Sequence, residues 1–428
     1  MHHTRVLRPA EGVYAFYDGR IAGYRFTEGT NWVDEGALGV GIASYAVVSG
    51  DRALVYDTHT STEHARFVRA ALEAEGVETF TVVLSHWHLD HVAGTEVFRD
   101  CEVISSERTA ELLERNAPAI ERGELEGPPP IDPLITPTRT YSDRLELEVG
   151  ELLVELIHVN IHSDDATVLW LRDPGILLCG DTMEDTVTYV DEPKAFGAHL
   201  RGLAELRRLD PAQILPNHGD PEVIAGGGYS AGLITATEQY IGLLRRLPEE
   251  PSLGEVSLRE VVAEPLQEGW INYFEPYEEV HRENVATVLA SGESEQLSNL
   301  RAALRAWNAG EYETALSYAH PDVIWRVEAF FPDMETLYQG HEEVRRFFAT
   351  FNEAWEENSL EVARVIDEHP GQILAEVKFT AKAREGLEFE APFHQIYRYD
   401  EDNLLTEFHG FVDEANARRE AGLGGGDG

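Results

Sequence analysis

The sequence predicts two domains, an α/β domain followed by a smaller α+β domain. Its 428 residues are too many for one ordinary hydrophobic core. Up to about residue 290, strand-like apolar segments alternate with segments of helical spacing; beyond it, helical segments precede a run of strand-like ones. We expect boundaries at 1–290 for the first domain, 291–296 for a linker, 297–420 for the second domain and 421–428 for a disordered Gly-rich tail.

Composition predicts a cytoplasmic protein. No apolar run reaches the ~18 residues that span a bilayer, and the start, Met1–Arg5, is not followed by a long apolar segment. Cys101 and Cys179 lack partners at motif spacing, which suits a reducing compartment.

The net charge of -44 argues against a nucleic-acid or anionic-membrane partner and leaves a small-molecule substrate as the expectation. The acidic residues are spread along the chain, as on a solvated acidic surface whose repulsion high salt screens. We therefore hypothesise a halophilic source. The alternative is a genome-wide acidic bias without salt adaptation.

The first ninety residues are expected to form several strands and one helix. Strands are expected at 12–18, 41–49, 52–56 and 80–84, and a helix at 63–75. The last strand leads into a loop that holds three imidazoles and a carboxylate: His86, His88, Asp90 and His91. So many polar groups at a strand end would cost stability unless they bind something. Imidazole and carboxylate are the ligands that Zn²⁺ or a similar metal ion takes.

Three later polar clusters also follow predicted strands. A hairpin around Gly150 leads to His162, a hairpin with its turn at 173–175 leads to Asp181, and a strand at 213–215 leads to His218. Between them, 107–122 and 200–209 read as helices, and 127–130 is an extended stretch that is either a substrate lid or a plain connector.

The order His-x-His-x-Asp-His, then His, Asp and His, each after a strand, resembles the metallo-β-lactamase-fold hydrolase superfamily. The resemblance covers about residues 10–290 and includes Asp57. It implies a four-layer αββα sandwich with a two-metal site at the edge between two sheets. The metal ligands that it implies are His86, His88 and His162 for one ion, Asp90, His91 and His218 for the other, and Asp181 as the bridge.

Two zinc ions are the expected cofactor, with iron or manganese as alternatives. Such a pair holds a bridging hydroxide at neutral pH, and this hydroxide attacks the substrate. Asp90 is the candidate catalytic residue, because it can orient the nucleophile while it binds metal. Asp57 and His59 suit support of the ligands, although His59 is equally well explained as a surface residue. For His158 we favour a structural role over a place in the pocket.

The sequence differs from several known branches of this superfamily. The reaction that we expect is therefore the hydrolysis of a small ester, lactone, thioester or sulfate ester. Zinc β-lactamases have Cys where this chain has Asp181, and Cys179 does not align with that position. The glutathione-thioesterase branch has a basic C-terminal cluster that is missing here. The alternatives are a mononuclear-iron persulfide dioxygenase-like oxidoreductase and a ligand-sensing binding protein with a vestigial metal domain.

The rest of the chain carries weaker signals. The aromatic stretch 270–277 reads as core rather than pocket wall, and 277–290 as the closing helix of the first domain.

The second domain resembles the SnoaL-like members of the nuclear transport factor 2-like superfamily. The cones of that superfamily often hold a small apolar ligand and often dimerise, so a homodimer through this domain is one expectation. The residues that carry the resemblance are Trp307, Asp322, Trp325, Tyr338 and Gly340. The candidates to line the cone are Glu328, His394 and His409.

Overall fold

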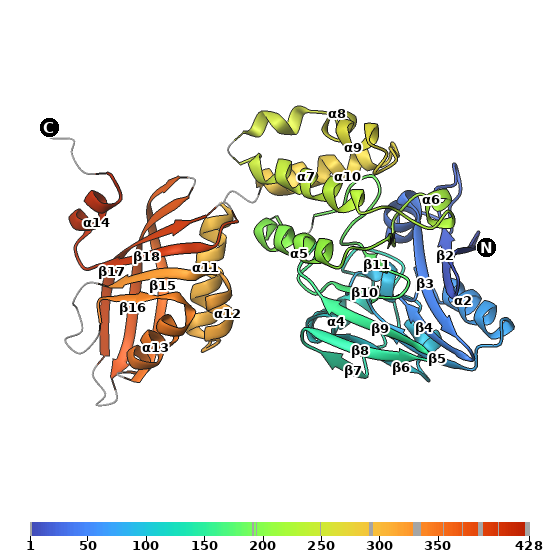
Figure 1. Cartoon of the computed structure of the whole chain (residues 1–428), viewed down its shortest axis with the longest axis horizontal. Coiled ribbons are helices and arrows are strands. Elements are labelled where there is room, and N and C mark those ends of the chain that lie inside the picture. The colour runs from blue at the N-terminus through green and yellow to red at the C-terminus, as the bar shows by residue number, and fades with distance from the viewer. Residues whose placement is uncertain are drawn as a thin grey trace. The chain divides into compact units, whose positions relative to one another are not determined.

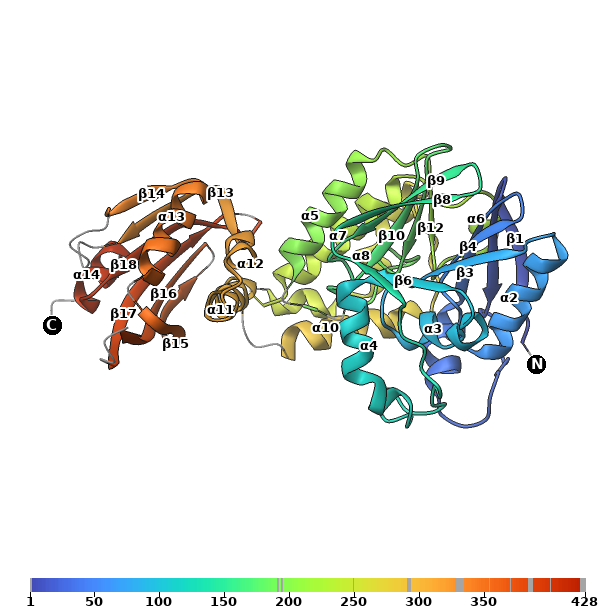
Figure 2. The same ribbon diagram turned by 90° about the horizontal axis from the view of Figure 1, so that it is seen from below.

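The computed structural model describes residues 2–190, 192–193, 195–248, 250–290, 294–327, 335–353, 355–369, 371–383, 388–400 and 402–423. The chain divides into two compact units, Met1–Ser291 and Gly292–Gly428, and each is described by itself (Figures 1 and 2). Within the described ranges, no helix is both long and apolar enough to cross a membrane.

The first sheet of the N-terminal unit has seven strands among the described residues, paired in chain order. They are β1 (Arg5–Ala10), β2 (Val13–Asp18), β3 (Ile42–Ser49), β4 (Arg52–Tyr56), β5 (Thr79–Val83), β6 (Glu102–Ser106) and β7 (Arg139–Tyr141). Strands β1 to β4 pair antiparallel, and β4 to β7 pair in parallel. The carboxyl ends of β4 and β5 therefore meet at one edge, where Asp57 and the histidine-rich loop follow them.

The second sheet has the order β12-β11-β10-β9-β8 in the described part of the unit. Its strands are β8 (Arg144–Val149), β9 (Leu152–His158), β10 (Thr167–Leu171), β11 (Ile176–Gly180) and β12 (Gln213–Pro216). Both predicted hairpins are present, because β8 pairs with β9 and β10 with β11 in antiparallel fashion. The parallel neighbours β11 and β12 deliver Asp181 and His218 to the same edge.

Helices cover the outer faces of both sheets, which confirms the four-layer αββα sandwich (Figure 2). The first sheet is covered by α2 (Thr62–Ala74) and α4 (Glu107–Ile120). The second sheet is covered by α5 (Phe196–Arg208), α7 (Gly232–Arg246) and α10 (Tyr277–Ala290). Shorter helical segments are η1 (Val33–Ala37), α1 (Leu38–Val40), α3 (Leu89–Val92), η2 (Thr95–Phe98), α6 (Pro221–Ala225), η3 (Pro251–Glu255), α8 (Leu258–Val261) and α9 (Ala263–Gln267).

Buried tyrosines of the first sheet bind backbone carbonyls of the second half of the unit. The hydroxyls of Tyr17, Tyr45 and Tyr56 donate to the carbonyl oxygens of Gly219 (3.0 Å), Pro216 (2.5 Å) and Thr167 (2.6 Å). Each ring adds apolar area to the core between the sheets, and each hydroxyl satisfies a buried carbonyl group. These bonds fix the two sheets against each other beside the strand ends that carry the polar clusters.

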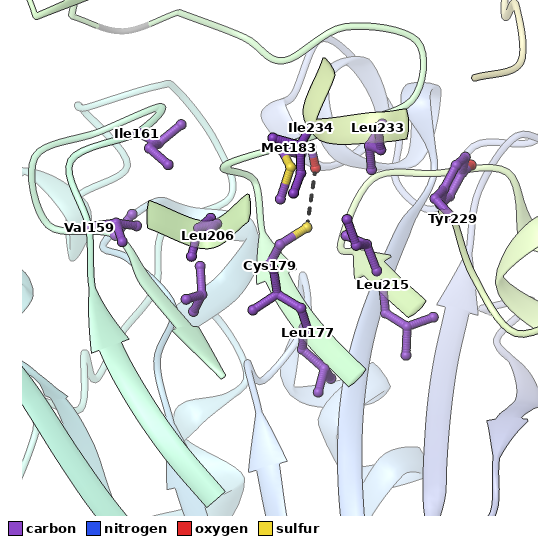
Figure 3. Close-up of a cluster of buried hydrophobic side chains, with 14 of the residues drawn as sticks. Val159, Ile161, Leu177, Cys179, Met183, Leu206, Leu215, Tyr229, Leu233 and Ile234 are labelled. Atoms are coloured by element: carbon purple, nitrogen blue, oxygen red, sulfur yellow. Dashed lines mark hydrogen bonds between the residues drawn. The ribbon is translucent and has the colours of Figure 1, made fainter. Parts of the chain in front are cut away.

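Cys179, at the end of β11, belongs to the apolar core between this sheet and helices α5 and α7. Leu177, Leu206, Leu215 and Ile234 are buried with it in one cluster (Figure 3). Burial raises the pKa of the Cys179 thiol, which favours the neutral form. The thiol therefore contributes to the packing of this core in its neutral form.

The C-terminal unit is a curved sheet with helices on both faces, which confirms the predicted α+β cone. Its strands, in the order β14-β13-β18-β17-β16-β15, are β13 (Ala319–Val327), β14 (Leu337–Gln339), β15 (Trp355–His369), β16 (Gln372–Ala383), β17 (Glu388–Tyr399) and β18 (Leu405–Phe411). Its helices are α11 (Glu295–Asn308), α12 (Tyr312–Ser317), α13 (Gly340–Glu353) and α14 (Glu414–Glu420). Helices α11 and α13 face the concave core, and α14 packs on the other face of the sheet.

Some element boundaries differ from the predictions. Helix α11 begins at Glu295, inside the predicted linker 291–296, because the Ser294 side chain caps it by accepting from the Leu297 N–H. The Gly-rich tail was predicted from 421, but Ala421 closes α14 through a backbone bond to Ala417. Residues 424–428 of that tail lie outside the described residues.

The cone contains a cavity of about 140 Å³ with an apolar lining that includes Trp307, Trp325 and Phe348. His394 and His409, which we expected to line the cone, do not line this cavity. Their strand neighbours Phe393, Gln395 and Gly410 do, because successive side chains of a strand point to opposite faces. Glu328, the third expected lining residue, lies outside the described residues.

Candidate metal centre

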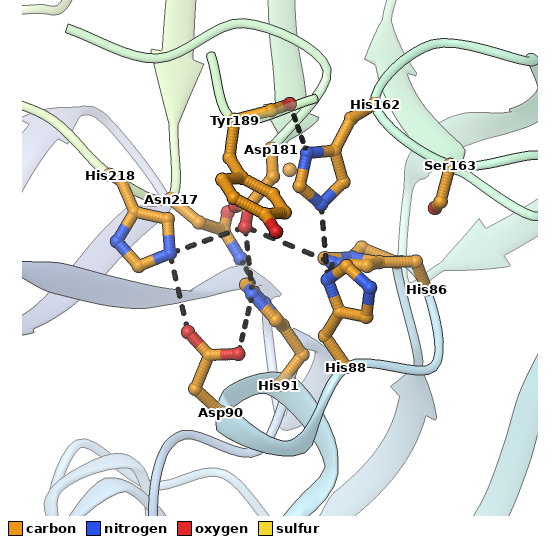
Figure 4. A network of polar contacts seen from close by, with 12 residues as sticks. His86, His88, Asp90, His91, His162, Ser163, Asp181, Tyr189, Asn217 and His218 are labelled. Carbon is orange, nitrogen blue, oxygen red and sulfur yellow. Dashed lines mark hydrogen bonds and ion pairs between the residues drawn. The ribbon is translucent and has the colours of Figure 1, made fainter. Parts of the chain in front are cut away.

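Two groups of metal-ligating side chains lie at one edge of the sandwich (Figure 4). All seven residues predicted as ligands fall into them: His86, His88 and His162 in the first group, and Asp90, His91, Asp181 and His218 in the second. Within each group the ligand atoms lie within 4.8 Å of one another. The loop after β5 and helix α3 supply four of these residues, and the loops after β9, β11 and β12 supply the others.

In the first group three imidazole nitrogens converge. His88 Nδ1 lies 3.0 Å from His86 Nε2 and 3.1 Å from His162 Nε2. Burial, together with the neighbouring His91 and His88, lowers the pKa of His86 well below its ordinary value. Neutral imidazoles with converging nitrogens are the form in which histidine binds a first-row metal ion.

In the second group two histidines face two carboxylates. His91 Nε2 lies 3.1 Å from Asp181 Oδ2 and 3.3 Å from Asp90 Oδ1, and His218 Nε2 lies 3.2 Å and 3.3 Å from the same two carboxylates. Burial acts to raise the pKa of Asp90, but His91 and His218 outweigh it and lower this pKa to about 2. The carboxylate is thus ionised at neutral pH and can bind a cation.

Asp181 faces both groups. Its Oδ2 lies 3.8 Å from His86 Nε2 of the first group, in addition to its contacts in the second. Its other oxygen, Oδ1, is buried without a hydrogen-bond partner. An unpartnered buried carboxylate oxygen is costly unless a cation compensates it. The donor set therefore fits divalent metal ions, and Asp181 lies between the two ligand groups.

The far nitrogen of four ligand histidines is held by a hydrogen bond. His91 Nδ1 donates to Asp57 Oδ2 (3.0 Å), His162 Nδ1 to the Tyr189 carbonyl oxygen (3.0 Å) and His218 Nδ1 to the Gly41 carbonyl oxygen (2.8 Å); His86 Nδ1 lies 2.8 Å from Ser85 Oγ. Such partners fix which nitrogen carries the proton, so that Nε2 is left to bind metal.

Asp57 is the main support of the second group. Besides His91, its Oδ2 accepts from Asn217 Nδ2 (2.5 Å), and its Oδ1 accepts from the Ser85 N–H (2.7 Å). One carboxylate thus links β4, the loop after β5 and the loop after β12. We predicted this supporting role for Asp57; the role of Asn217 was missed, although it stands beside His218 in the sequence.

Backbone strain is concentrated at this edge. Asp57, His59 and His162 all have φ between 66° and 71°, a region that residues other than glycine seldom adopt. Strain of this kind costs about 1–3 kcal/mol per residue and is typical of functional sites. The tyrosine bonds between the sheets and the Asp57 network hold the chain in this conformation.

Other sequence-predicted residues lie outside the two ligand groups. His59 is buried and stacks on His64 at a ring distance of 4.3 Å, which excludes the surface interpretation. His158 Nε2 donates to the Asp164 carbonyl oxygen at 2.9 Å, as a structural residue does. In the aromatic stretch, Tyr277 is buried and its hydroxyl donates to Glu184, in line with the core interpretation. In the stretch 127–130, Pro129 accepts a hydrogen bond from Trp32 Nε1.

Sequence reasoning missed three residues near the site: Glu184, Tyr189 and His199. No spacing signal marks Glu184 and Tyr189, because they lie in the irregular segment after β11, and His199 lies on α5, one residue before the predicted helix 200–209. Burial raises the pKa of Glu184 to about 7, although His218 acts against it. His199 is buried, and neither of its ring nitrogens has a hydrogen-bond partner. Burial, with a smaller effect from His162, lowers the pKa of His199 to about 3.

Two family models match parts of this chain. Residues 38–219 match the metallo-beta-lactamase superfamily model, and residues 300–408 match the SnoaL-like domain model. Beta-lactamase-like protein 2 homologs of Drosophila melanogaster and Caenorhabditis elegans are each 24% identical over 186 residues. The match covers 42% of this chain and only 59% and 56% of those relatives.

Among solved structures, DIM-1 metallo-beta-lactamase exposed to ceftazidime is similar at 18% identity and a TM-score of 0.42, over 56% of this chain and 96% of that one. A metallo-beta-lactamase from Pontibacter korlensis is similar at 19% identity and a TM-score of 0.40, over 54% and 99%.

The sandwich, the site at its edge and the set of His and Asp side chains together fit a divalent-metal site of the metallo-β-lactamase fold. The N-terminal unit carries a metallo-β-lactamase superfamily domain, and the C-terminal unit carries a SnoaL-like domain.

Replacing Asp57 by Asn should weaken metal binding by about 10- to 100-fold, because the amide no longer holds the His91 ring as a carboxylate does. Competition with a fluorescent zinc chelator measures this. The exposed Asp51→Asn is the matched control and should bind zinc as the wild type does. Unchanged affinity in Asp57→Asn would show that Asp57 does not support the metal site.

Replacing His199 by Leu should make the fold more resistant to acid. The unfolded imidazole has a pKa of 6.5 and the folded one of about 3. As pH falls below 6.5, the unfolded chain gains a proton that the folded chain does not bind, so the folded state loses stability. Between pH 7.5 and 5 this loss is about 2 kcal/mol at His199 and vanishes in the variant. Urea unfolding in EDTA at pH 7.5 and pH 5 measures the free energy of unfolding of the wild type and of His199→Leu. An equal loss of stability in both proteins would contradict the prediction.

Proposed function

We propose that the N-terminal unit is a hydrolase that uses two zinc ions to cleave a small ester, lactone, thioester or sulfate ester. The observation that carries this proposal is the position of Asp181 between the two ligand groups, with one buried oxygen unpartnered. When bound, two divalent ions supply Lewis acidity and a water that ionises near neutral pH. The net charge of -44 supports a small-molecule substrate rather than a nucleic acid.

Asp90 is the residue proposed to act on the attacking water. Its side chain is 18% exposed, whereas that of Asp181 is 5% exposed, so Asp90 is the more open of the two carboxylates. It is ionised at neutral pH and can accept a hydrogen bond from the water. It would thereby orient the lone pair of the water toward the substrate.

The C-terminal cavity supports a second proposal, that this unit binds a small apolar ligand. Its lining is almost entirely aromatic and aliphatic, with Leu304, Phe347 and Tyr397 among the side chains. A pocket with this lining gains affinity from apolar burial and discriminates against charged molecules. The cavity lies within the C-terminal unit and contains none of the predicted metal ligands.

Asp181→Ala should lower the bound metal from about two zinc ions per chain to about one or none and abolish hydrolysis, because the carboxylate between the groups is lost. Elemental analysis in high-salt buffer, on protein made without added metal, measures the first effect. A panel of lactones, thioesters and sulfate esters measures the second, with Asp51→Asn as the control.

About one iron ion per wild-type chain, with oxygen uptake in the presence of a persulfide, would replace this proposal by the single-iron oxidoreductase. Wild-type protein without any bound metal would favour a binding protein. Turnover that persists in Asp181→Ala would contradict the two-metal mechanism.

Ala303→Phe should abolish binding of a small apolar fluorescent probe such as 1-N-phenylnaphthylamine. Ala303 lines the cavity from α11, and a benzyl group there would extend into the space that the probe needs. Ala302→Phe, the next residue of the same helix and not a lining residue, is the matched control. Equal probe binding by both variants would show that the cavity is not the ligand site.

A further inference from the structure

Tyr189 differs from its neighbours in the segment that follows β11. Every residue of 181–190 is buried except Tyr189, which is half-buried. Figure 4 shows its ring directed at the space between the two ligand groups, with the phenol oxygen on the side of His86 and His88. The ring lies beside the His162 ring, with centroids 6.2 Å apart and the planes at 61°.

The backbone on both sides of Tyr189 is anchored by buried polar groups. Its N–H donates to Glu184 Oε1 (2.9 Å), and its carbonyl oxygen accepts from His162 Nδ1 (3.0 Å). Asn284 accepts from the Val190 N–H (2.9 Å) and donates to the Thr188 carbonyl oxygen (3.0 Å). These bonds fix the Cα–Cβ direction of Tyr189, and the contact with the His162 ring limits the rotation of the phenol about it.

We propose that the Tyr189 hydroxyl donates a hydrogen bond to the substrate oxygen that becomes negative as the scissile group is attacked. This inference rests on the proposed hydrolase function. Ionised Asp90 and Asp181 only accept hydrogen bonds, and the ligand histidines direct their nitrogens at the metal positions, whereas the phenol is a neutral donor that is directed at the same space. The proton stays on the phenol, so that no bond to Tyr189 forms or breaks.

A purely structural role for Tyr189 makes a different prediction. If the ring acts only by packing beside His162, phenylalanine replaces it without any loss of anion binding. If the hydroxyl contacts an anionic oxygen, Tyr189→Phe weakens anion binding while the metal ligands keep their geometry. Tyr14→Phe, a half-buried tyrosine on β2, is the matched control for loss of a hydroxyl.

The experiment uses the full chain loaded with cobalt, whose visible absorption bands report on the ligands, and titrates it with phenylphosphonate as a tetrahedral anionic probe. We expect Tyr189→Phe to keep the cobalt bands of the wild type and to raise the Kd for phenylphosphonate about tenfold or more, the effect of one hydrogen bond to a charged group. Tyr14→Phe should bind the probe as the wild type does.

An unchanged Kd in Tyr189→Phe would overturn the inference, as would a cobalt-loaded wild type that does not bind the probe. A wild type without cobalt bands would overturn the metal site and the inference together. Cobalt bands and a weaker Kd in Tyr189→Phe, without turnover of any ester in the panel, would support the Tyr189 contact and overturn the hydrolase proposal alone.

Discussion

The site depends on the balance between two buried carboxylates and the imidazoles that face them. Without a cation, Asp90 and Asp181 draw protons onto His91 and His218: burial acts to lower the pKa of each histidine, but the carboxylates outweigh it and raise both well above the ordinary value. Divalent metal ions would replace these protons, since only deprotonated histidine binds metal. Metal binding should therefore release protons, and the stability of this edge is linked to metal occupancy.

The rest of the N-terminal unit keeps these groups in place. Buried hydroxyls of Tyr17 and Tyr45 hold the chain around β12, where His218 lies, and Asp57 holds His91 from the other side. Because these groups come from both sheets, the ligand geometry is a property of the packed sandwich and not of any one loop. The positive φ at His162 persists for the same reason: the surrounding bonds outweigh its local cost.

The sequence predicted the parts of the site that repeat a local pattern. His86, His88, Asp90 and His91 stand within six residues, and each later ligand directly follows an apolar strand, so strand ends located them. Glu184 and Tyr189 follow β11 without a periodic pattern, and His199 lies on α5 without a neighbouring metal-ligating residue in the sequence; only the folded backbone brings the three near the site. The edge strands β1, β7 and β14 were missed because none of them carries a continuous apolar run: charged residues and a proline interrupt β1, and β7 and β14 have three residues that include polar ones. In the cone, alternation placed the strands, but the face to which His394 points depended on a register that the sequence left open.

The segment after β11 carries both a proposed metal ligand and the proposed hydrogen-bond donor to the substrate. It begins with Asp181, which faces both ligand groups, and it carries Tyr189 eight residues later. The Thr188 hydroxyl donates to the Asp181 carbonyl oxygen at 2.7 Å, and Glu184 binds the Tyr189 N–H. Metal ligand and phenol therefore belong to one hydrogen-bonded unit, and a shift of either moves the other. The segment has no regular secondary structure, yet it is almost completely buried, and these hydrogen bonds satisfy part of its buried backbone. In the proposed mechanism, this one segment would supply both a metal ligand and the donor to the substrate oxygen.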